Sequence, residues 1–284
     1  MERTTSRGTV ASADRRFLIG LSRAFGAAIF FSLPLLMTME MWQLGFSLDR
    51  FRVVLFILFI LPLLIVLDRY SGFMETSSWA EDAIDGVIAF GVGAVAATVI
   101  LLLFNIIGPD MPMREVVGKV ALQAVPGGFG AVLANSQFSA DRGADSGADE
   151  ARQASGYAAV LFIMLAGAVF LAFNVAPTEE IVLLSVRMSA THAIVMVLLT
   201  LGMMHAFVFA AGFRGSPDTP EHETGWNLFL RFTVVGYVVA LLVSAYVLWT
   251  FGRFEGQLLH ANTMQSVVLA LPAGLGAAAA RLIL

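Results

Sequence analysis

The chain has 284 residues, of which 58% are hydrophobic and only 13% are charged, and its mean hydropathy is +0.82. Soluble domains contain about 45–50% apolar and about 25% charged residues, so this composition is typical of an integral membrane protein. The net charge of −4 indicates no partner, because the charges lie in short polar segments and at the ends. The absence of cysteine excludes disulfides, thiolate metal sites and cysteine nucleophiles.

Eight apolar stretches are long enough to cross a bilayer, which takes about 20 residues each. In chain order they are about 18–43, 52–70, 84–108, 114–136, 157–180, 190–213, 227–251 and 262–283. The fourth is the weakest, because Lys119, Gln123 and Pro126 dilute it. The sequence therefore predicts an all-α polytopic membrane protein with eight transmembrane helices.

The two halves of the chain match each other at four anchors in collinear order. The matching pairs are Thr38 and Glu40 with Thr178 and Glu180, Gly72-Phe73 with Gly212-Phe213, Trp79 with Trp226, and Ala124–Ala131 with Ala270–Ala277. Because the anchors include rare residues such as Trp, Pro and Glu, they indicate an internal duplication. With four spans per half, the two halves insert in the same direction, which predicts parallel four-helix repeats about an axis along the membrane normal.

This pattern divides the chain into four parts: a polar tail over 1–16, a first four-helix repeat over 17–136, a flexible polar linker over 137–155 and a second repeat over 156–284. No Ala-x-Ala cleavage site follows the first apolar run, so we expect a retained span and not a signal peptide. The arginine distribution predicts that both termini lie in the cytoplasm. We expect a multi-pass protein of a bacterial inner membrane.

The chain resembles an uncharacterised family of bacterial integral membrane proteins with eight predicted spans. The resemblance covers most of the chain and rests on Pro34 through Gly45, including Thr38-Met39-Glu40-Met41-Trp42, and on Pro177-Thr178-Glu179-Glu180. It supports the predicted architecture and implies no activity.

Glu40 and Glu180 are the main candidates for chemistry, because each is a carboxylate near the end of an apolar stretch. At 1.5 Å per residue, Glu40 is expected about 24 Å along its helix from Ala24, inside a core of about 30 Å. A charge at that depth costs about 2.5–3.5 kcal/mol, so it should face protein, water or a cation. If symmetry brings the two carboxylates together, a shared proton or a bound cation would relieve their repulsion. Further oxygen ligands are expected from Glu179, Thr38, Thr178 and Asn174.

The same residues also fit a structural role. The segment Pro177-Thr178-Glu179-Glu180 has the pattern of a helix start, with threonine as the N-cap and acidic residues in the first turn. Trp42 fits the aromatic belt of a membrane interface, which would place Glu40 in contact with water. Both interpretations are open at this point.

Prolines and glycines predict breaks or close contacts in four of the helices. Proline frees a backbone carbonyl, and glycine permits close helix packing. Such positions either line a transport pathway or serve tight packing alone. The residues concerned are Pro34, Pro177, Pro126, Pro272, Gly128 and Gly274.

Two further polar residues are expected at membrane depth. His205 could relay protons, or it could be a hydrogen-bonded interior histidine. Asp85 could enter the third span with Arg231 as its partner, or lie at a solvated helix N-terminus. The four histidines show no metal-ligand spacing, and no phosphate loop, Ser-His-Asp arrangement or basic-aromatic surface is present. The sequence therefore predicts no cofactor and no nucleic-acid partner, and it identifies no metal.

These observations favour a non-enzymatic permease for a small cation, with proton coupling if the glutamates share a proton. A non-catalytic scaffold or envelope-stress protein is the main alternative. A membrane enzyme acting on a lipid or polyprenyl substrate is a third. The expected partners are the lipid bilayer and a small cation or proton, and the Gly/Ala faces allow a homo-oligomer.

Overall fold

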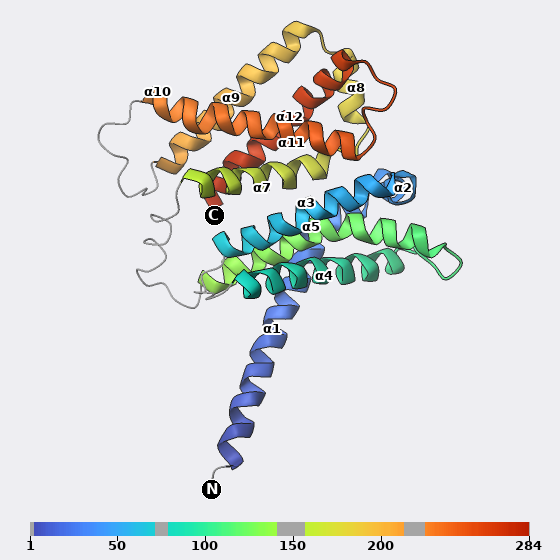
Figure 1. Cartoon of the computed structure of the whole chain (residues 1–284), viewed down its shortest axis with the longest axis vertical. Coiled ribbons are helices and arrows are strands. Elements are labelled where there is room, and N and C mark those ends of the chain that lie inside the picture. The colour runs from blue at the N-terminus through green and yellow to red at the C-terminus, as the bar shows by residue number, and fades with distance from the viewer. Residues whose placement is uncertain (1–2, 72–78, 141–156, 213–224, 284) are drawn as a thin grey trace. The chain divides into compact units, whose positions relative to one another are not determined.

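A computed structural model describes residues 3–71, 79–140, 157–212 and 225–283. Within these ranges every regular element is a helix (Figure 1). In the first half the helices are α1 (Arg3–Leu36), α2 (Met39–Ser47), α3 (Arg50–Ser71), α4 (Trp79–Leu103) and α5 (Met113–Ala140). In the second half they are α7 (Tyr157–Val175), α8 (Glu180–Arg187), α9 (Ala190–Gly212), α10 (Gly225–Leu228), the π-helix η1 (Phe229–Val234), α11 (Val235–Thr250) and α12 (Leu259–Ile283).

Eight of the described helical segments are long and apolar enough to cross a membrane. They are Leu18–Leu36, Arg50–Arg69, Trp79–Leu103, Met113–Ala134, Tyr157–Val175, Ala190–Phe207, Trp226–Thr250 and Leu259–Arg281. The predicted all-α architecture with eight transmembrane helices is thereby confirmed. Most of the predicted linker, together with the anchors at 72–73 and 213, lies outside the described residues.

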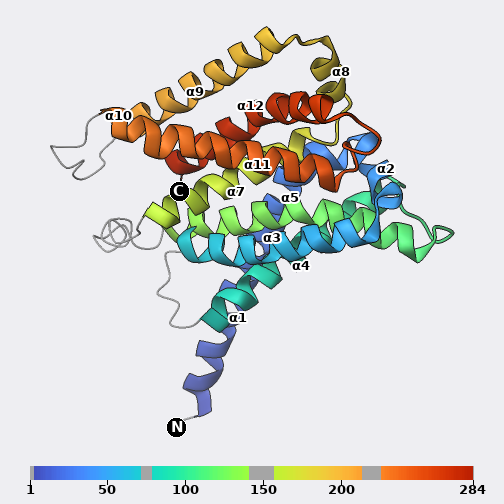
Figure 2. The same cartoon turned by 45° about the horizontal axis from the view of Figure 1, so that its top comes forward.

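The first and fifth spans differ from the prediction, because each ends early and a short separate helix follows (Figure 2). The predicted stretches 18–43 and 157–180 end instead at Leu36 and Val175. In the second half, Pro177 has no N–H and disfavours helical backbone in the residue before it, which stops α7. In the first half, Pro34 removes a donor from the last turns of α1.

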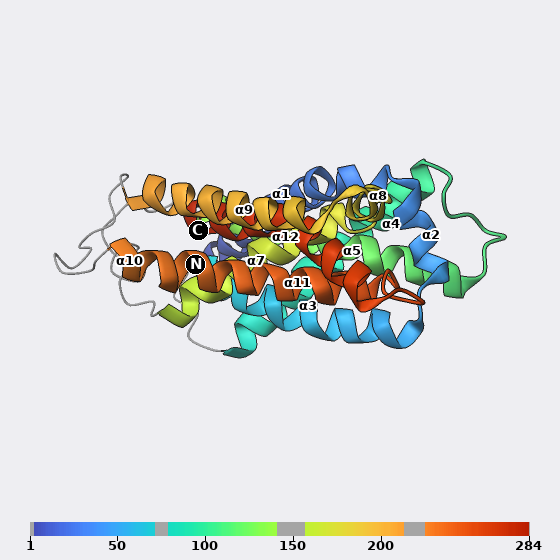
Figure 3. The same ribbon diagram turned by 90° about the horizontal axis from the view of Figure 1, so that it is seen from above.

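The chain forms two compact units. The first comprises residues 1–46 and 57–144, and the second comprises 47–56 and 145–284. In each half of the chain a long helix is followed by a short helix and three further spans. In the first unit α4 and α5 run lengthwise beside one another, as α7 and α11 do in the second (Figure 3). The N-terminal part of α1, where a polar tail was predicted, is helical from Arg3 and extends away from the other helices of its unit (Figure 1).

The last helix is the central one in each unit. α5 packs against α1 and α4, and α12 packs against α7, α8, α9 and α11. In these two spans 67% and 61% of the residues are buried inside the protein, against 17–39% in the other six. The polar residues that weaken the fourth apolar stretch are therefore shielded by protein, since that helix has neighbours on most sides.

Pro126 and Pro272 lie inside the continuous helices α5 and α12, so neither proline ends a helix. Packed neighbours can hold a transmembrane helix together where proline removes one hydrogen bond. The glycines near Pro126 serve close packing, because a Cβ on Gly93 of α4 would meet the backbone of Ala124, Gly127 and Gly128 of α5. This arrangement matches the packing interpretation of the proline-glycine segment.

Candidate functional site

The helix break is the same in both units, because a threonine folds back on the helix that has just ended. The Thr38 hydroxyl donates to the Leu35 carbonyl at 2.9 Å, and the Thr178 hydroxyl donates to the Val175 carbonyl at 2.9 Å. The backbone N–H of each threonine donates to the same carbonyl at 3.1 Å. The expected N-cap role is therefore wrong, since each hydroxyl binds the preceding helix and not the following one.

The three glutamates lie at the starts of the short helices, outside the apolar spans. Glu40 is half-buried in the first turn of α2, whereas Glu180 is exposed as the first residue of α8. Glu179 is exposed at the N-cap position and makes no capping hydrogen bond. The expectation of one helix carrying Glu40 through the membrane is wrong, because α1 ends at Leu36. Carboxylates at these positions interact favourably with the helix dipole.

Glu40 belongs to the first unit and Glu180 to the second, so the convergence of their carboxylates stays a prediction. Asn174, another expected ligand, is tied to its own helix, because its Nδ2 donates to the Phe170 carbonyl at 2.7 Å. The first break nevertheless lies beside a set of buried polar groups that the sequence did not identify as a site.

This set is a row of polar side chains on α5, which we call the α5 polar row: Glu115, Lys119 and Gln123. Residues spaced four apart share one face of a helix. Lys119 Nζ lies 2.7 Å from Glu115 Oε1, and Gln123 Nε2 donates to the Leu35 carbonyl at 3.1 Å. Lys119 is 6% exposed and Gln123 is fully buried. A charged side chain inside a span is costly and is a functional candidate for that reason.

Two features of the α5 polar row suit a binding site. Gln123 Oε1 is buried and has no hydrogen-bond partner within the described chain, so one acceptor faces inward without a donor. The row is also covered by α2, since a Cβ on Gly45 would lie 2.7 Å from Cα of Lys119. Trp42 of α2 donates through Nε1 to the Leu36 carbonyl at 2.9 Å, which fixes the short helix to the end of α1.

The sequence signal for this row was the four-residue spacing of Glu115, Lys119 and Gln123 in an otherwise apolar helix. From the sequence alone, Lys119 and Gln123 indicate only that this span is less apolar than the others. Their role depends on the Leu35 carbonyl, which is 88 residues away from Gln123 in the chain. No local pattern reveals that partner.

The second break is also bordered by a cationic side chain, and the helix that packs on α8, α12, carries buried polar groups. Arg253 donates through Nη2 to the Pro177 carbonyl. Asn262 and Gln265 of α12 each have a buried side-chain oxygen without a partner in the described residues. Gln265 follows Lys119 by 146 positions, the same offset that relates the proline-glycine segments. Here the charge comes from the connection before α12 and not from the helix itself.

An acidic group occupies the opposite end of the first unit, between α3 and α4. Asp82 is 1% exposed and pairs with Arg69 at 2.6 Å, and the Arg69 guanidinium lies 4.3 Å above the Trp79 ring. The sequence pointed to Asp85 as the residue entering the membrane, but Asp82 is the buried carboxylate and Asp85 is half-buried. The predicted partner of Asp85, Arg231, belongs to the other unit, so that pairing stays a prediction.

His205 is a half-buried histidine whose ring is hydrogen-bonded within the second unit. Its Nδ1 lies 3.1 Å from Oγ1 of Thr233, which is fully buried in η1, and its ring meets Phe229 edge-on with centroids 5.2 Å apart. This geometry matches the structural alternative that the sequence left open.

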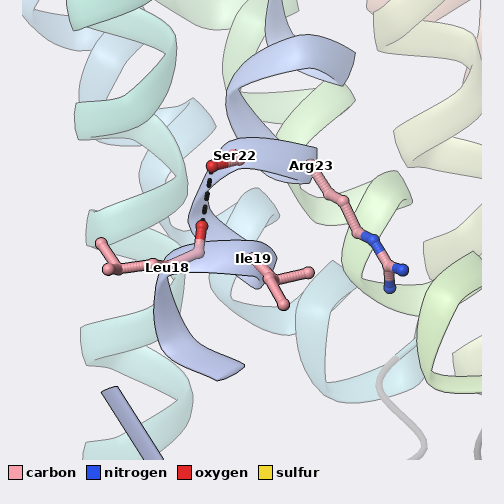
Figure 4. Close-up of a pocket in the computed structure, with 4 residues that line it drawn as sticks. All are labelled: Leu18, Ile19, Ser22 and Arg23. Atoms are coloured by element: carbon pink, nitrogen blue, oxygen red, sulfur yellow. Dashed lines mark hydrogen bonds between the residues drawn. The ribbon is translucent and has the colours of Figure 1, made fainter. Parts of the chain in front are cut away.

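A surface hollow and the possible metal ligands can also be compared with the breaks, within the described residues. A hollow on α1 is lined by Leu18, Ile19, Ser22 and Arg23 (Figure 4). Its hydroxyl is already used, since Ser22 Oγ donates to the Leu18 carbonyl at 2.8 Å. Among the described residues, no group of three or more histidine, aspartate or glutamate side chains is arranged to hold a metal ion.

Comparison with known proteins identifies a family but no activity. No curated protein matches the chain, and no solved structure does. A family model described as "Putative integral membrane protein (DUF2391)" matches residues 20–284. The resemblance found in the sequence is confirmed by this match. The chain belongs to the DUF2391 family of integral membrane proteins.

Proposed function

We propose that the protein is a permease for a small cation and that the helix breaks are its transport sites. The observation that carries the proposal is the α5 polar row beside the break between α1 and α2. Discontinuous transmembrane helices are the usual places where transporters bind ions, because their ends present backbone groups that can line a cavity. Buried ionisable residues in spans mark ion pathways or proton relays.

Within this proposal, Glu115 is the carboxylate that takes the cation or proton. The ammonium group of Lys119 lies 2.7 Å from Glu115 Oε1 and neutralises the carboxylate. An arriving cation or proton would replace this ammonium group. Gln123 Oε1 offers a second oxygen one turn away. Glu40, Glu180 and Glu179 at the starts of the short helices would attract cations toward the breaks.

The test is a cation-flux assay on the full chain reconstituted in liposomes, with sodium, potassium and protons measured separately. We expect flux of at least one of these cations in the wild type and a loss of about tenfold or more in Glu115→Gln, since one charge-assisted contact is worth about that factor. Asp110→Asn removes an exposed carboxylate from the same unit and should leave flux unchanged. Absence of flux in the wild type, or full flux in Glu115→Gln, would end the proposal.

A non-catalytic membrane scaffold is a second candidate, and one observation favours it. The polar groups at the breaks are already bonded within the protein: Thr38 and Gln123 both donate to the Leu35 carbonyl, and Thr178 donates to the Val175 carbonyl. Under this candidate, substitutions in the α5 polar row lower stability, and the wild type moves no cation.

The architecture proposed with this function consists of two parallel four-helix repeats with both termini in the cytoplasm of a bacterial inner membrane. Two features support the duplication: the helices occur in the same order in both units, and Thr38 and Thr178 form the same turn at the same place. The proposal also includes a homo-oligomer, because small residues on the faces of the spans would let helices of two copies pack closely.

A further inference from the structure

Three helix ends meet at one end of the second unit, around the ring of Phe232. The start of α7, the π-helix η1 and the end of α12 lie there together (Figure 1). Phe232 of η1 meets Tyr157 of α7 with ring centroids 5.7 Å apart. The guanidinium carbon of Arg281, near the end of α12, lies 4.0 Å above the same ring.

A second guanidinium group faces these rings. Arg231 lies 4.5 Å above the Tyr157 ring and 5.8 Å from the Phe232 ring. The Tyr157 hydroxyl donates to the Arg231 backbone carbonyl at 2.7 Å, which ties the start of α7 to η1. Stacking on an aromatic face orients a guanidinium plane while its N–H edge stays available to oxygen acceptors.

One donor of Arg281 is unsatisfied. Its Nη1 is enclosed and has no hydrogen-bond partner in the described part of the chain. No carboxylate among the described residues pairs with it either. Leaving a charged donor unsatisfied is unfavourable, and an anionic oxygen would remove that cost.

The position of the two arginines indicates which class of anion they would bind. Arg281 ends one apolar span, and Arg231 lies near the start of another. Span ends lie at the level of lipid headgroups, where phosphodiesters are the abundant anions and basic pockets between helices bind them. Val238 and Leu242 of α11 are exposed about two and three turns beyond Arg231, which gives an acyl chain an apolar surface on the same helix.

We propose that Arg231 and Arg281 form a binding site for the phosphate group of an anionic phospholipid. The aromatic rings of Tyr157 and Phe232 hold the two guanidinium groups, and a turn of the Arg281 side chain brings its enclosed Nη1 to a phosphate oxygen. Arg231 is exposed and makes the first contact, while Arg281 is half-buried and holds the bound group. The site is independent of the transport sites proposed above.

The test compares the thermal stability of the detergent-purified full chain in short-chain phosphatidylglycerol and in short-chain phosphatidylcholine. We expect a larger rise in Tm with phosphatidylglycerol. In Arg231→Gln/Arg281→Gln the apparent affinity should fall by about tenfold or more, because each lost charge-assisted hydrogen bond is worth about one decade. Arg187→Gln, which removes an exposed arginine at the end of α8, should keep the full response.

Three outcomes would overturn the proposal: equal stabilisation by the two lipids, an unchanged response in the double variant, or an equal response to inorganic phosphate at the same concentration. The last would assign the site to free anions. Native mass spectrometry of the wild type gives a readout that needs no variant. Retention of a bound phosphatidylglycerol, but not of phosphatidylcholine, is the expected spectrum, and its absence counts against the site.

Discussion

At the scale of single residues, the ion pair between Glu115 and Lys119 has unequal partners. The Lys119 side chain is 8% exposed, whereas that of Glu115 is 26% exposed. Water can therefore solvate the carboxylate if it loses its partner, but it reaches the ammonium group much less easily. A charge stranded in the interior is the costly outcome of breaking such a pair.

This asymmetry predicts that Glu115→Gln destabilises the protein more than Lys119→Met does. Glu115→Gln leaves a buried ammonium group and should cost about 3–5 kcal/mol of unfolding free energy, while Lys119→Met should cost less. The double variant Glu115→Gln/Lys119→Met removes both charges and should lie closer to the wild type than Glu115→Gln alone. Chemical unfolding in detergent measures all three. Equal losses in the two single variants would contradict the predicted asymmetry.

The sequence predicted some of the candidate residues but not their surroundings. Glu40 and Glu180 stand out because they occupy matching positions in the two halves. Their place at the starts of short helices was missed, because hydropathy does not register a turn closed by Thr38 or Thr178. The role of Gln123 was missed for another reason, since its carbonyl partner comes from a distant part of the chain.

At the scale of helices, α2 and α8 depend on their neighbours. They have 9 and 8 residues, which is too short for an isolated helix to be stable in water. α2 is held by close backbone contact with α5 at Gly45 and Gly118. α8 packs against α12 and buries Ile181 and Ser185.

We predict that Gly118→Ala weakens the contact between α2 and α5. An added Cβ would collide with the Gly45 carbonyl oxygen, and overpacking of this kind costs about 1–3 kcal/mol. The matched control is Gly91→Ala in α4, where nothing lies within 4 Å of an added Cβ. That substitution should be neutral or stabilise the helix by about 0.5–1 kcal/mol. Thermal unfolding of both variants in detergent tests this prediction. Similar Tm values for Gly118→Ala and Gly91→Ala would contradict the close contact between α2 and α5.

Helix number was predictable, whereas two kinds of helix detail were not. Length and hydropathy reveal a span because the bilayer imposes both. The early ends of α1 and α7 depend on single prolines and hydroxyl groups inside runs that remain apolar. The π-helix over Phe229–Val234 lies within the same predicted span as the α-helix that continues it, so hydropathy does not mark where one ends and the other begins.

At the scale of the whole molecule, the second unit includes a piece of chain from the first half. Residues 47–56 belong to it, and Phe56 is the residue through which they enter its core. Phe56 is fully buried, and its ring stacks on Phe173 with centroids 5.3 Å apart. Arg52 pairs with Glu255 at 2.8 Å and donates to the Trp249 carbonyl at 3.1 Å.

We expect Phe56→Ala to destabilise the second unit by about 3–5 kcal/mol, because it removes a large buried aromatic side chain. Phe51→Ala is the control, since Phe51 is exposed in the same segment. Hydrogen exchange followed by mass spectrometry should show faster exchange in α7 and α11 in Phe56→Ala alone. Unchanged exchange in these helices would show that the unit is complete without Phe56.

The dependence on Phe56 also has a consequence for biogenesis. The ribosome makes residues 47–56 well before Phe173 and Phe251, the rings that Phe56 meets in the finished unit. The beginning of α3 must therefore remain in the membrane without its final partners until α7 and α11 have been made. During synthesis, residues 47–56 should gain their protection from hydrogen exchange only after these two helices are in place.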